Sequence, residues 1–249
     1  MRQLTVVIPT YNEAKNLPSL IEHLFETPIS NLKLIIVDDG SPDGTGQLAE
    51  ELAERLPGRL SVVHRAGKMG LGSAYIRGFG VALSDGAQAI GQMDADFSHS
   101  PSYLPGFLAK LDQWDAVFGS RYVEGGRVDE RWSFGRRFLS NFGNTYARVI
   151  LRLQVRDSTG GFRFWRAETL NALPLERIRS EGYVFQVEMA YLAQRMGFQI
   201  SEQPIYFEDR RIGQSKMSLR IQLEAAIRVW LLPYIYRGLQ PKITEDLNQ

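Results

Sequence analysis

Two aspartates, Asp94 and Asp96, follow a short apolar run and have one residue between them. Residues two apart in a strand point to the same side, so both carboxylates can project from the end of a strand over residues 87–93. Open α/β sheets commonly hold their ligands at such strand ends. Hard oxygen donors with no cysteine or histidine directly beside them suit Mg²⁺ or Mn²⁺ carrying a substrate diphosphate. A plain turn, with Asp96 capping the next helix, is the alternative.

The composition is that of an ordinary globular protein, with 44% hydrophobic and 23% charged residues in a chain of 249. Because there is no cysteine, disulfides, thiolate catalysis and cysteine-based zinc sites are excluded. The three histidines, His23, His64 and His99, are scattered, and His99 fits a loop residue better than a metal ligand. A formal net charge of +1 offers no general reason to expect nucleic acid as a partner.

The sequence shows neither a signal peptide nor a membrane span. The apolar core of residues 1–9 is short and passes directly into a strand pattern. No apolar run approaches the ~20 residues that span a bilayer. The longest candidate, residues 221–236, contains Glu224, Arg228 and Pro233. We therefore expect a soluble or peripheral protein and not an integral one.

The first half of the chain alternates strands with helices. Short apolar runs predict strands at residues 4–9, 32–37, 60–64, the run before Asp94, and 116–119. This spacing indicates a doubly wound, mostly parallel sheet flanked by helices, the α/β class. Polar residues follow three of these strands: Tyr11 and Glu13, Asp38 and Asp39, and Asp94 and Asp96. Since the carboxyl ends of parallel strands share one edge, we expect all of them to gather there.

The second half is rich in arginine and ends in amphipathic helices. Helices are expected at residues 138–153, from about residue 186, and at 218–236, with a strand at 199–207. Arg136 and Ser140 have the spacing that places two residues on one face at a helix start. The final helix carries an apolar stripe that either packs against the sheet or lies on a membrane surface: Leu219, Leu223, Ile227, Trp230, Leu231 and Tyr234.

Two common nucleotide-binding motifs are absent from the sequence. There is no G-x-x-x-x-G-K-[ST] loop, which weakens an ATPase interpretation. There is no G-x-G-x-x-G after the first expected strand, where a dinucleotide-binding dehydrogenase needs it. The glycines of residues 67–72 are better explained by a tight turn.

Several motifs resemble those of a known family. V-V-I-P-T-Y-N-E, V-D-D-G-S-P-D-G-T and D-A-D, in this order, are similar to family-2 glycosyltransferases of the GT-A fold. Over residues 4–220, the chain also resembles the dolichyl-phosphate (polyprenyl-phosphate) mannosyltransferases in M-D-A-D-F-S-H-S-P, G-S-R-Y, D-S-T-G-G-F-R-F, E-G-Y-V-F-Q-V-E-M and D-R-R-I-G-Q-S-K-M. The resemblance implies one GT-A domain over residues 1–237, with a nucleotide-binding half (1–120) and an acceptor half (121–237), before a polar tail at 238–249.

The resemblance further implies inverting transfer of mannose from GDP-mannose to a polyprenyl (dolichyl) monophosphate. A phosphate monoester has its second pKa near about 6, so the acceptor is already an anion at neutral pH and needs no general base. The protein must then hold two polyanions close together and neutralise them, a task suited to a metal ion and to guanidinium groups. Two alternatives remain: a glucosyltransferase that uses UDP-glucose, and a non-catalytic accessory subunit of the same fold.

Site residues are also implied by the resemblance. The donor nucleotide would meet Pro9, Tyr11, Glu13, Val37, Asp39, Asp94, Ala95, Asp96, Arg121, Arg210 and Lys216. Asp94 and Asp96 would hold Mg²⁺ or Mn²⁺, and catalysis would depend on Asp94, Asp96, Arg121, Arg210 and Lys216. The acceptor phosphate would be received by Arg121, Arg136 and Ser140, with help from the helix dipole. Arg137, Arg163 and Glu188 are secondary candidates, and Asp38 is expected to cap a turn.

The expected partners follow from this chemistry. They are GDP-mannose, the lipid phosphate, and a membrane surface that the protein meets peripherally on its cytoplasmic side. Because some relatives continue into membrane helices and this chain stops at residue 249, a small membrane-anchoring subunit is a further candidate partner. Nucleic acid is not expected, since acids at the sheet edge would repel its phosphates.

Overall fold

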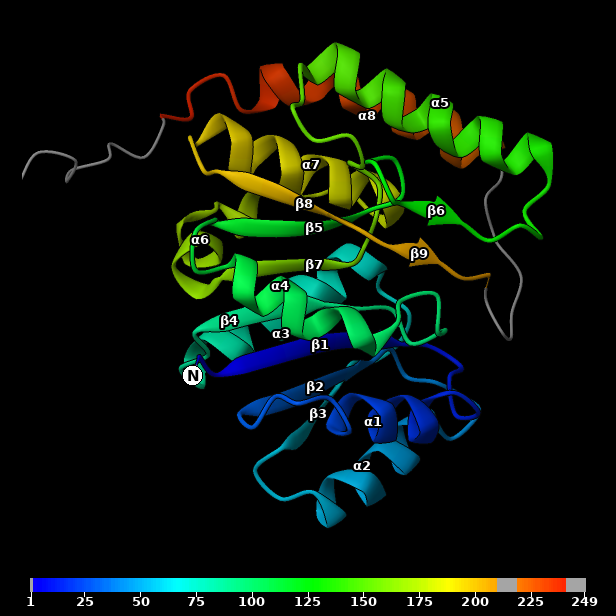
Figure 1. Cartoon of the computed structure of the whole chain (residues 1–249), viewed down its shortest axis with the longest axis vertical. Helices are drawn as coiled ribbons and strands as arrows, with labels where there is room; N and C mark the ends of the chain where they lie inside the picture. Colours follow the sequence, from blue (N-terminus) through cyan, green and yellow to red (C-terminus); the bar gives the residue numbers. More distant parts are fainter. Residues whose placement is uncertain (1, 210–218, 241–249) are drawn as a thin grey trace, which may run out of the picture.

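The computed structural model describes residues 2–209 and 219–240, which form a seven-stranded sheet covered by helices on both faces (Figure 1). The strand order is β3-β2-β1-β4-β7-β5-β8. The strands are β1 (Leu4–Thr10), β2 (Leu32–Asp38), β3 (Leu60–His64), β4 (Ala89–Gln92), β5 (Ala116–Ser120), β7 (Arg163–Arg166) and β8 (Ile200–Pro204). A separate two-stranded sheet joins β6 (Arg127–Val128) to β9 (Tyr206–Phe207).

Helices connect the strands in the order that the sequence predicts. They are α1 (Leu17–Phe25), α2 (Thr45–Arg55), α3 (Leu71–Ser84), α4 (Leu104–Lys110), α5 (Phe134–Leu151), α6 (Ala167–Ala172), α7 (Gly182–Arg195) and α8 (Leu219–Ile235), with short 3₁₀ turns η1 (Pro101–Tyr103) and η2 (Leu175–Arg177). The predicted doubly wound, mostly parallel α/β sheet is confirmed.

One strand of the large sheet runs against the others. β7 is antiparallel to both β4 and β5, whereas β1, β2, β3 and β4 pair in parallel, as do β5 and β8. Arg163, the first residue of β7, pairs with Phe118 and Gln92 near the carboxyl ends of their strands. The chain therefore enters β7 at the carboxyl edge, where β5 ends, and β7 runs antiparallel to its neighbours.

Two apolar layers hold the sheet between the helices. Leu4, Val6 and Ile8 of β1 pack with α1 and α4, while Val7 points to the opposite layer, against α3. This alternation is the period of two that a strand buried on both faces requires. Both layers hold the strand ends rigidly, which matters because the candidate site lies there.

Three element boundaries differ from the expectation. The helix expected from about residue 186 begins at Gly182. The helix expected from residue 138 begins at Phe134, because the Ser133 hydroxyl accepts a hydrogen bond from the backbone N–H of Arg136 and caps the first turn. The strand expected over residues 199–207 is divided into β8 and β9. Pro204 ends β8, and its missing N–H prevents the ladder from continuing there.

α8 does not pack as a core helix along its predicted apolar stripe. In the part whose side chains are described, Val229 and Leu232 of α8 are buried, as is Tyr236 directly after it, and the helix contacts α5 and α7. The stripe residues Ile227, Trp230, Leu231 and Tyr234 are exposed. For these four described residues, packing of the stripe against the sheet is therefore wrong, because they are exposed on a helix that lies against α5 and α7. Neither α8 nor any other helix in the described ranges is long and apolar enough to cross a bilayer.

Candidate active site

The polar residues that follow β1, β2 and β4 do gather at one edge of the sheet. β1 pairs in parallel with β2 on one side and with β4 on the other, so the three strands end together. The predicted common edge is thus confirmed. The residues that line it come from the loops directly after each strand.

Asp94 lies half-buried just beyond the end of β4 and is held from two sides. Its Oδ1 accepts a hydrogen bond from the Tyr75 hydroxyl at 3.0 Å, and its backbone N–H donates to His99 Nδ1 at 3.2 Å. His99 is buried and stacks on Phe162, with 4.7 Å between ring centroids. Burial lowers the pKa of His99, so the ring stays neutral and Nδ1 can accept. His99 therefore supports the Asp94 backbone.

Asp96 is buried and is fixed by its own loop. Its Oδ1 accepts hydrogen bonds from the backbone N–H of Ser98 at 3.1 Å and from the Ser98 hydroxyl at 2.5 Å. Gly161 lies beside Asp94, the other carboxylate of the pair. A Cβ at residue 161 would lie 3.6 Å from Asp94 Oδ2, so the glycine leaves that space open.

The pair offers oxygen donors only. Within residues 2–209 and 219–240, no cluster of three or more Asp, Glu, His or Cys side chains is arranged to hold a metal. An ion at Asp94 and Asp96 would thus need further ligands from substrate phosphate or water. Mg²⁺ is commonly bound in this way, by one or two carboxylates together with phosphate oxygens. The donor set therefore fits a hard divalent cation.

Asp39, at the end of β2, is tied to the glycine-rich loop after β3. Its Oδ1 lies 3.1 Å from Arg65 Nη1, and its Oδ2 accepts from the backbone N–H of Met69 at 3.2 Å. Burial raises the pKa of Asp39, and the charge of Arg65 opposes that effect. Glu181 holds the other end of the loop by accepting from the backbone N–H of Gly72 at 3.1 Å.

The remaining residues predicted to bind the donor lie at the same edge with different exposure. Pro9, Tyr11 and Glu13 are half-buried, whereas Val37 is fully buried, so only its backbone can meet a ligand. Asp38 accepts hydrogen bonds from the Ser41 backbone N–H and hydroxyl and from the Thr10 hydroxyl. The prediction that Asp38 caps a turn is confirmed.

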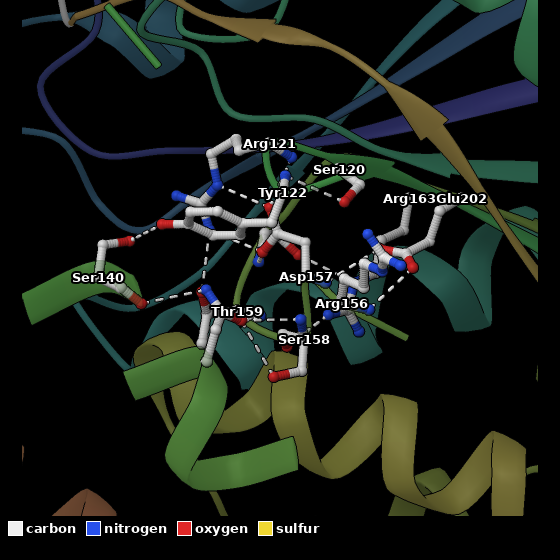
Figure 2. Close-up of polar contacts among 12 residues, drawn as sticks. Ser120, Arg121, Tyr122, Ser140, Arg156, Asp157, Ser158, Thr159, Arg163 and Glu202 are labelled. Carbon is white, nitrogen blue, oxygen red and sulfur yellow. Dashed lines mark hydrogen bonds and ion pairs between the residues drawn. The ribbon is translucent and has the colours of Figure 1, made fainter. Parts of the chain in front are cut away.

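Arg121, directly after β5, forms a buried two-pronged ion pair with Asp157 (Figure 2). Nε donates to Oδ2 and Nη2 donates to Oδ1, each at 2.7 Å, and Nη2 also donates to Thr159 Oγ1 at 2.9 Å. Burial by itself raises the pKa of Asp157, but the charge and hydrogen bonds of Arg121 outweigh it and hold that pKa below its usual range. Nε and Nη2 of Arg121 thus donate to protein oxygens, and no hydrogen bond from its Nη1 is found among the described residues.

Arg136 and Ser140 lie one turn apart on α5, as predicted. Arg136 Nη1 is 2.7 Å from Asp209 Oδ1, and its guanidinium carbon is 3.9 Å from the centre of the Trp132 ring. The Tyr122 hydroxyl donates to Ser140 Oγ at 2.8 Å, which places Ser140 beside the segment that carries Arg121 (Figure 2).

Arg210 and Lys216 lie outside the described residues, as does residue 241 onwards of the predicted tail. Asp209 is the described residue that precedes Arg210, and its carboxylate is the partner of Arg136. The residue that precedes Arg210 is therefore held against α5.

The three secondary candidates, Arg163, Glu188 and Arg137, form hydrogen bonds with other protein groups. Arg163 is fully buried and donates to the carbonyls of Gly160, Gln186 and Ser158, and burial lowers its pKa to about 9. Glu188 is buried beneath α8 and accepts from the Tyr236 hydroxyl at 2.7 Å. The exposed Arg137 donates to the carbonyls of Asp129 and Glu130.

Five residues that support the site were not singled out as site residues from the sequence: Tyr75, Arg65, Tyr122, Asn144 and Asp157. Tyr122 and Asp157 do lie in two of the motifs quoted above, G-S-R-Y and D-S-T-G-G-F-R-F. Their roles depend on which residue lies opposite in space, a relationship that residue types and spacing along the chain do not express.

A mostly parallel sheet that presents paired carboxylates at its carboxyl edge defines an open α/β protein, a class that commonly binds its ligands at that edge. Residues 5–173 match the model of glycosyl transferase family 2, and the chain belongs to that family. The expected family is confirmed.

Two curated relatives match nearly the whole chain. A polyprenol monophosphomannose synthase of Mycolicibacterium smegmatis is 43% identical over 225 residues, covering 90% of this chain and 84% of the relative. An undecaprenyl-phosphate mannosyltransferase of Micrococcus luteus is 42% identical over 245 residues, covering 98% of this chain and 99% of the relative.

Solved structures agree on the fold. The glucosyl-3-phosphoglycerate synthase of Mycobacterium tuberculosis, in complex with Mn²⁺, UDP and glucosyl-3-phosphoglycerate, superposes with a TM-score of 0.64 at 20% identity, covering 97% of this chain and 82% of that one. The same enzyme with Mn²⁺ and UDP-glucose gives a TM-score of 0.63 at 18% identity, covering 97% and 81%. At this identity the likeness shows the fold, and the expected GT-A type is confirmed.

Proposed function

We propose that this protein transfers mannose from GDP-mannose to a polyprenyl monophosphate. The observation that carries the proposal is the 42–43% identity, over 90–98% of this chain, to two relatives named for making mannosylated polyprenyl phosphates. In the reaction, an acceptor phosphate oxygen forms a bond to the anomeric carbon of mannose as the bond from that carbon to the diphosphate breaks. GDP leaves, and the configuration inverts.

The proposed chemistry makes no use of a general base from the protein. The acceptor phosphate has its second pKa near about 6 and is already a nucleophile at neutral pH. What the chain supplies is position and positive charge around two polyanions. Arg121, through Nη1, and Arg210 and Lys216 would contact the donor phosphates, while Arg136 and Ser140, with Arg121, would receive the acceptor phosphate.

A divalent cation belongs to the proposed site. Asp94 and Asp96 would hold Mg²⁺ or Mn²⁺, since they supply oxygen donors and leave the remaining positions to phosphate. The cation, when bound, would offset the negative charge of the departing diphosphate. Support comes from the structural neighbour whose crystals contain Mn²⁺ with UDP-glucose. The nucleoside would lie against Pro9, Tyr11, Glu13, Asp39 and the backbone of Val37, and the diphosphate beside Ala95.

We also propose a division of labour within one domain over residues 1–237, ahead of the tail at 238–249. Residues 1–120 would bind the donor, and residues 121–237 the acceptor. The pairing of β4 with β7 and the hydrogen bond from the Trp165 indole N–H to Gln92 Oε1, at 2.8 Å, join the two halves, which supports treating them as one unit.

A lipid acceptor requires contact with a membrane, and we assign that contact to α5 and α8. These helices touch one another and lie side by side beyond α7 (Figure 1). Their exposed large apolar residues, called here the apolar face, are Phe134, Phe138, Leu139, Phe142, Val149, Ile227, Trp230, Leu231 and Tyr234. Phe134 is 85% and Trp230 64% exposed, unusual for large apolar side chains of a protein without a partner on that face. We therefore propose that the protein is held peripherally on a membrane, and that it lies on the cytoplasmic face, as the resemblance implies.

A transfer assay tests the proposal. Purified protein with Mg²⁺ or Mn²⁺ and a phosphopolyprenol is offered labelled GDP-mannose or UDP-glucose in parallel. We expect a mannosylated lipid and free GDP. Transfer from UDP-glucose alone would reassign the protein to the glucosyl branch. Binding of GDP-mannose without any lipid product would make it an accessory subunit.

A further inference from the structure

The turn at residues 157–160 lies between Arg121 and the helix that carries Ser140 (Figure 2). Asp157 holds the Arg121 guanidinium through two hydrogen bonds. The hydroxyl oxygen of Thr159 accepts from Arg121 Nη2 and from Asn144 Nδ2, both at 2.9 Å. One threonine hydroxyl therefore joins the arginine to α5.

Asn144 is buried on α5, and both the oxygen and the nitrogen of its side-chain amide form hydrogen bonds with this turn. Its Oδ1 accepts from the backbone N–H of Ser158 at 2.9 Å, from the Ser158 hydroxyl at 3.2 Å and from the backbone N–H of Thr159 at 3.1 Å. Its Nδ2 also donates to the carbonyl of Ser140 at 3.2 Å. A buried amide with all of these bonds made holds one orientation, because any rotation would leave polar groups unpaired.

Tyr122 provides a second, direct link. It follows Arg121 in the chain, and its hydroxyl donates to Ser140 Oγ at 2.8 Å. Ser140 lies one helical turn before Asn144, so both links meet α5 within the same stretch of helix. The acceptor-side serine is thus held to the Arg121 segment by its side chain, through Tyr122, and by its carbonyl, through Asn144.

We propose that Tyr122 and Asn144 are positioning residues that fix the distance between Arg121, which would contact both phosphates, and Ser140, which would contact the acceptor phosphate alone. The inference rests on the proposed function and adds to it how Arg121 and Ser140, the two phosphate-binding groups, are kept at a fixed distance from each other. Displacement requires the reacting atoms to meet at about 3–3.5 Å, so a small shift of α5 lowers the rate steeply. Neither residue needs to touch a substrate to have this effect.

The variant Tyr122→Phe tests the direct link, since it removes one hydroxyl and keeps the ring. We expect kcat/KM for a phosphopolyprenol to fall on the order of 3- to 10-fold, the usual value of one hydrogen bond. The dissociation constant of GDP, measured by calorimetry with Mn²⁺, should stay at the wild-type value. Tyr146→Phe is the matched control, because its hydroxyl bonds the Ala226 carbonyl of α8 and not Ser140. It should leave both constants unchanged.

A double-mutant cycle separates positioning from a general loss of packing. In a Ser140→Ala background the Tyr122 hydroxyl has lost its acceptor, so Tyr122→Phe should cause no further loss. Asn144→Asp keeps the accepting oxygen but loses the two donated bonds, and it should also lower kcat/KM for the lipid while GDP binding is retained. Proper folding of each variant is checked by its thermal transition.

Two results would overturn the inference: wild-type acceptor kinetics in Tyr122→Phe, or a loss of the same size in the Ser140→Ala background. A wild-type protein that yields no mannosylated lipid would instead contradict the proposed function. The two failures are therefore distinguishable, because the first requires an active wild-type enzyme.

Discussion

Tyr75 on α3 donates its hydroxyl to Oδ1 of Asp94, beyond the end of β4, across 3.0 Å. The tyrosine is fully buried, and its ring stacks on Phe185 with 6.0 Å between centroids. Burial, and then the charge of Asp94, raise the pKa of Tyr75 well above its usual value, so the hydroxyl remains a donor at any physiological pH. One oxygen of the first carboxylate is thus held in place by the protein, and this defines where Asp94 presents its other oxygen.

The first prediction concerns this bond. Tyr75→Phe should weaken Mn²⁺-dependent GDP binding, because Asp94 loses a fixed donor to a charged group, a contribution of about 1.5–3 kcal/mol. Titration calorimetry with and without Mn²⁺ measures it. Tyr191→Phe removes a phenol hydroxyl from another mostly buried position, on α7, and serves as the control. Equal affinities for Tyr75→Phe and wild type would show that Asp94 needs no such support.

The second prediction concerns the buried ion pair. Asp157→Asn leaves the Arg121 charge buried without its partner and should lower the free energy of unfolding by about 3–5 kcal/mol. Urea denaturation at neutral pH gives the value. Asp112→Asn removes an exposed pair with Arg2 and should change stability by less than about 1 kcal/mol. A loss in Asp157→Asn as small as in this control would contradict the pairing.

The same pair makes stability depend on pH. The pKa of Asp157 is lower in the folded state than in the unfolded chain, where it is about 3.9. Its contribution is therefore fully present above pH ~4 and is lost as the pH falls through the folded-state pKa. We expect the stability difference between wild type and Asp157→Asn to shrink as the solution is acidified below that point. A difference that stays constant across the acid range would exclude the linkage.

A pair of glycines gives the third prediction. Gly70 has φ +100°, and a Cβ there would lie 2.2 Å from Glu181 Oε2, so Gly70→Ala should cost about 1–3 kcal/mol and weaken GDP binding through the loop tied to Asp39. Gly80, in the interior of α3, has nothing within 4 Å of a built Cβ. Gly80→Ala should stabilise the protein by about 0.5–1 kcal/mol. Thermal unfolding of both variants measures these changes in stability. A Gly70→Ala variant as stable as the wild type would contradict the predicted backbone strain at Gly70.

The fourth prediction concerns the apolar face. Replacing Phe138 and Trp230 together by serine should reduce binding to anionic lipid vesicles at least several-fold while GDP binding is retained, because both side chains are exposed on that face. Vesicle co-sedimentation provides the measurement. Met69→Ser is the control. It removes a side chain of similar exposure, 62%, from the loop after β3, the outermost strand at the opposite end of the strand order from β8. Unchanged sedimentation of the double variant would favour an anchoring subunit as the partner of this face.

The sequence predicted the sheet well because its strands are short apolar runs with turn formers between them, as at residues 32–40. It also placed Asp94 and Asp96 at the carboxyl edge, since parallel strands end together. It could not show that β7 runs backwards, because a four-residue strand carries no sign of its direction. The partners of Arg121 and Ser140 could not be predicted for a different reason. Asp157, for example, is 36 residues from Arg121 in the sequence, and only the fold brings the two side chains into contact.

The buried face of α8 shows a different limit. Helical periodicity identified an apolar stripe correctly, but it cannot distinguish a stripe that faces the core from one that faces a lipid surface. Tyr236, outside the predicted stripe, is fully buried because its hydroxyl reaches Glu188 on α7. The inward side of α8 is thus the one that carries Val229 and Leu232, and the contact from Tyr236 to Glu188 lies at the end of that side.

The central claim is that Asp94 and Asp96 form one phosphate-binding centre with Arg121. The most direct test is a crystal grown with Mn²⁺ and GDP and measured at the manganese absorption edge. We predict one strong anomalous peak bonded to carboxylate oxygens of Asp94 and Asp96, with the GDP phosphates beside it and within reach of Arg121 Nη1. A manganese peak away from both aspartates, or a diphosphate out of reach of Arg121, would contradict the account.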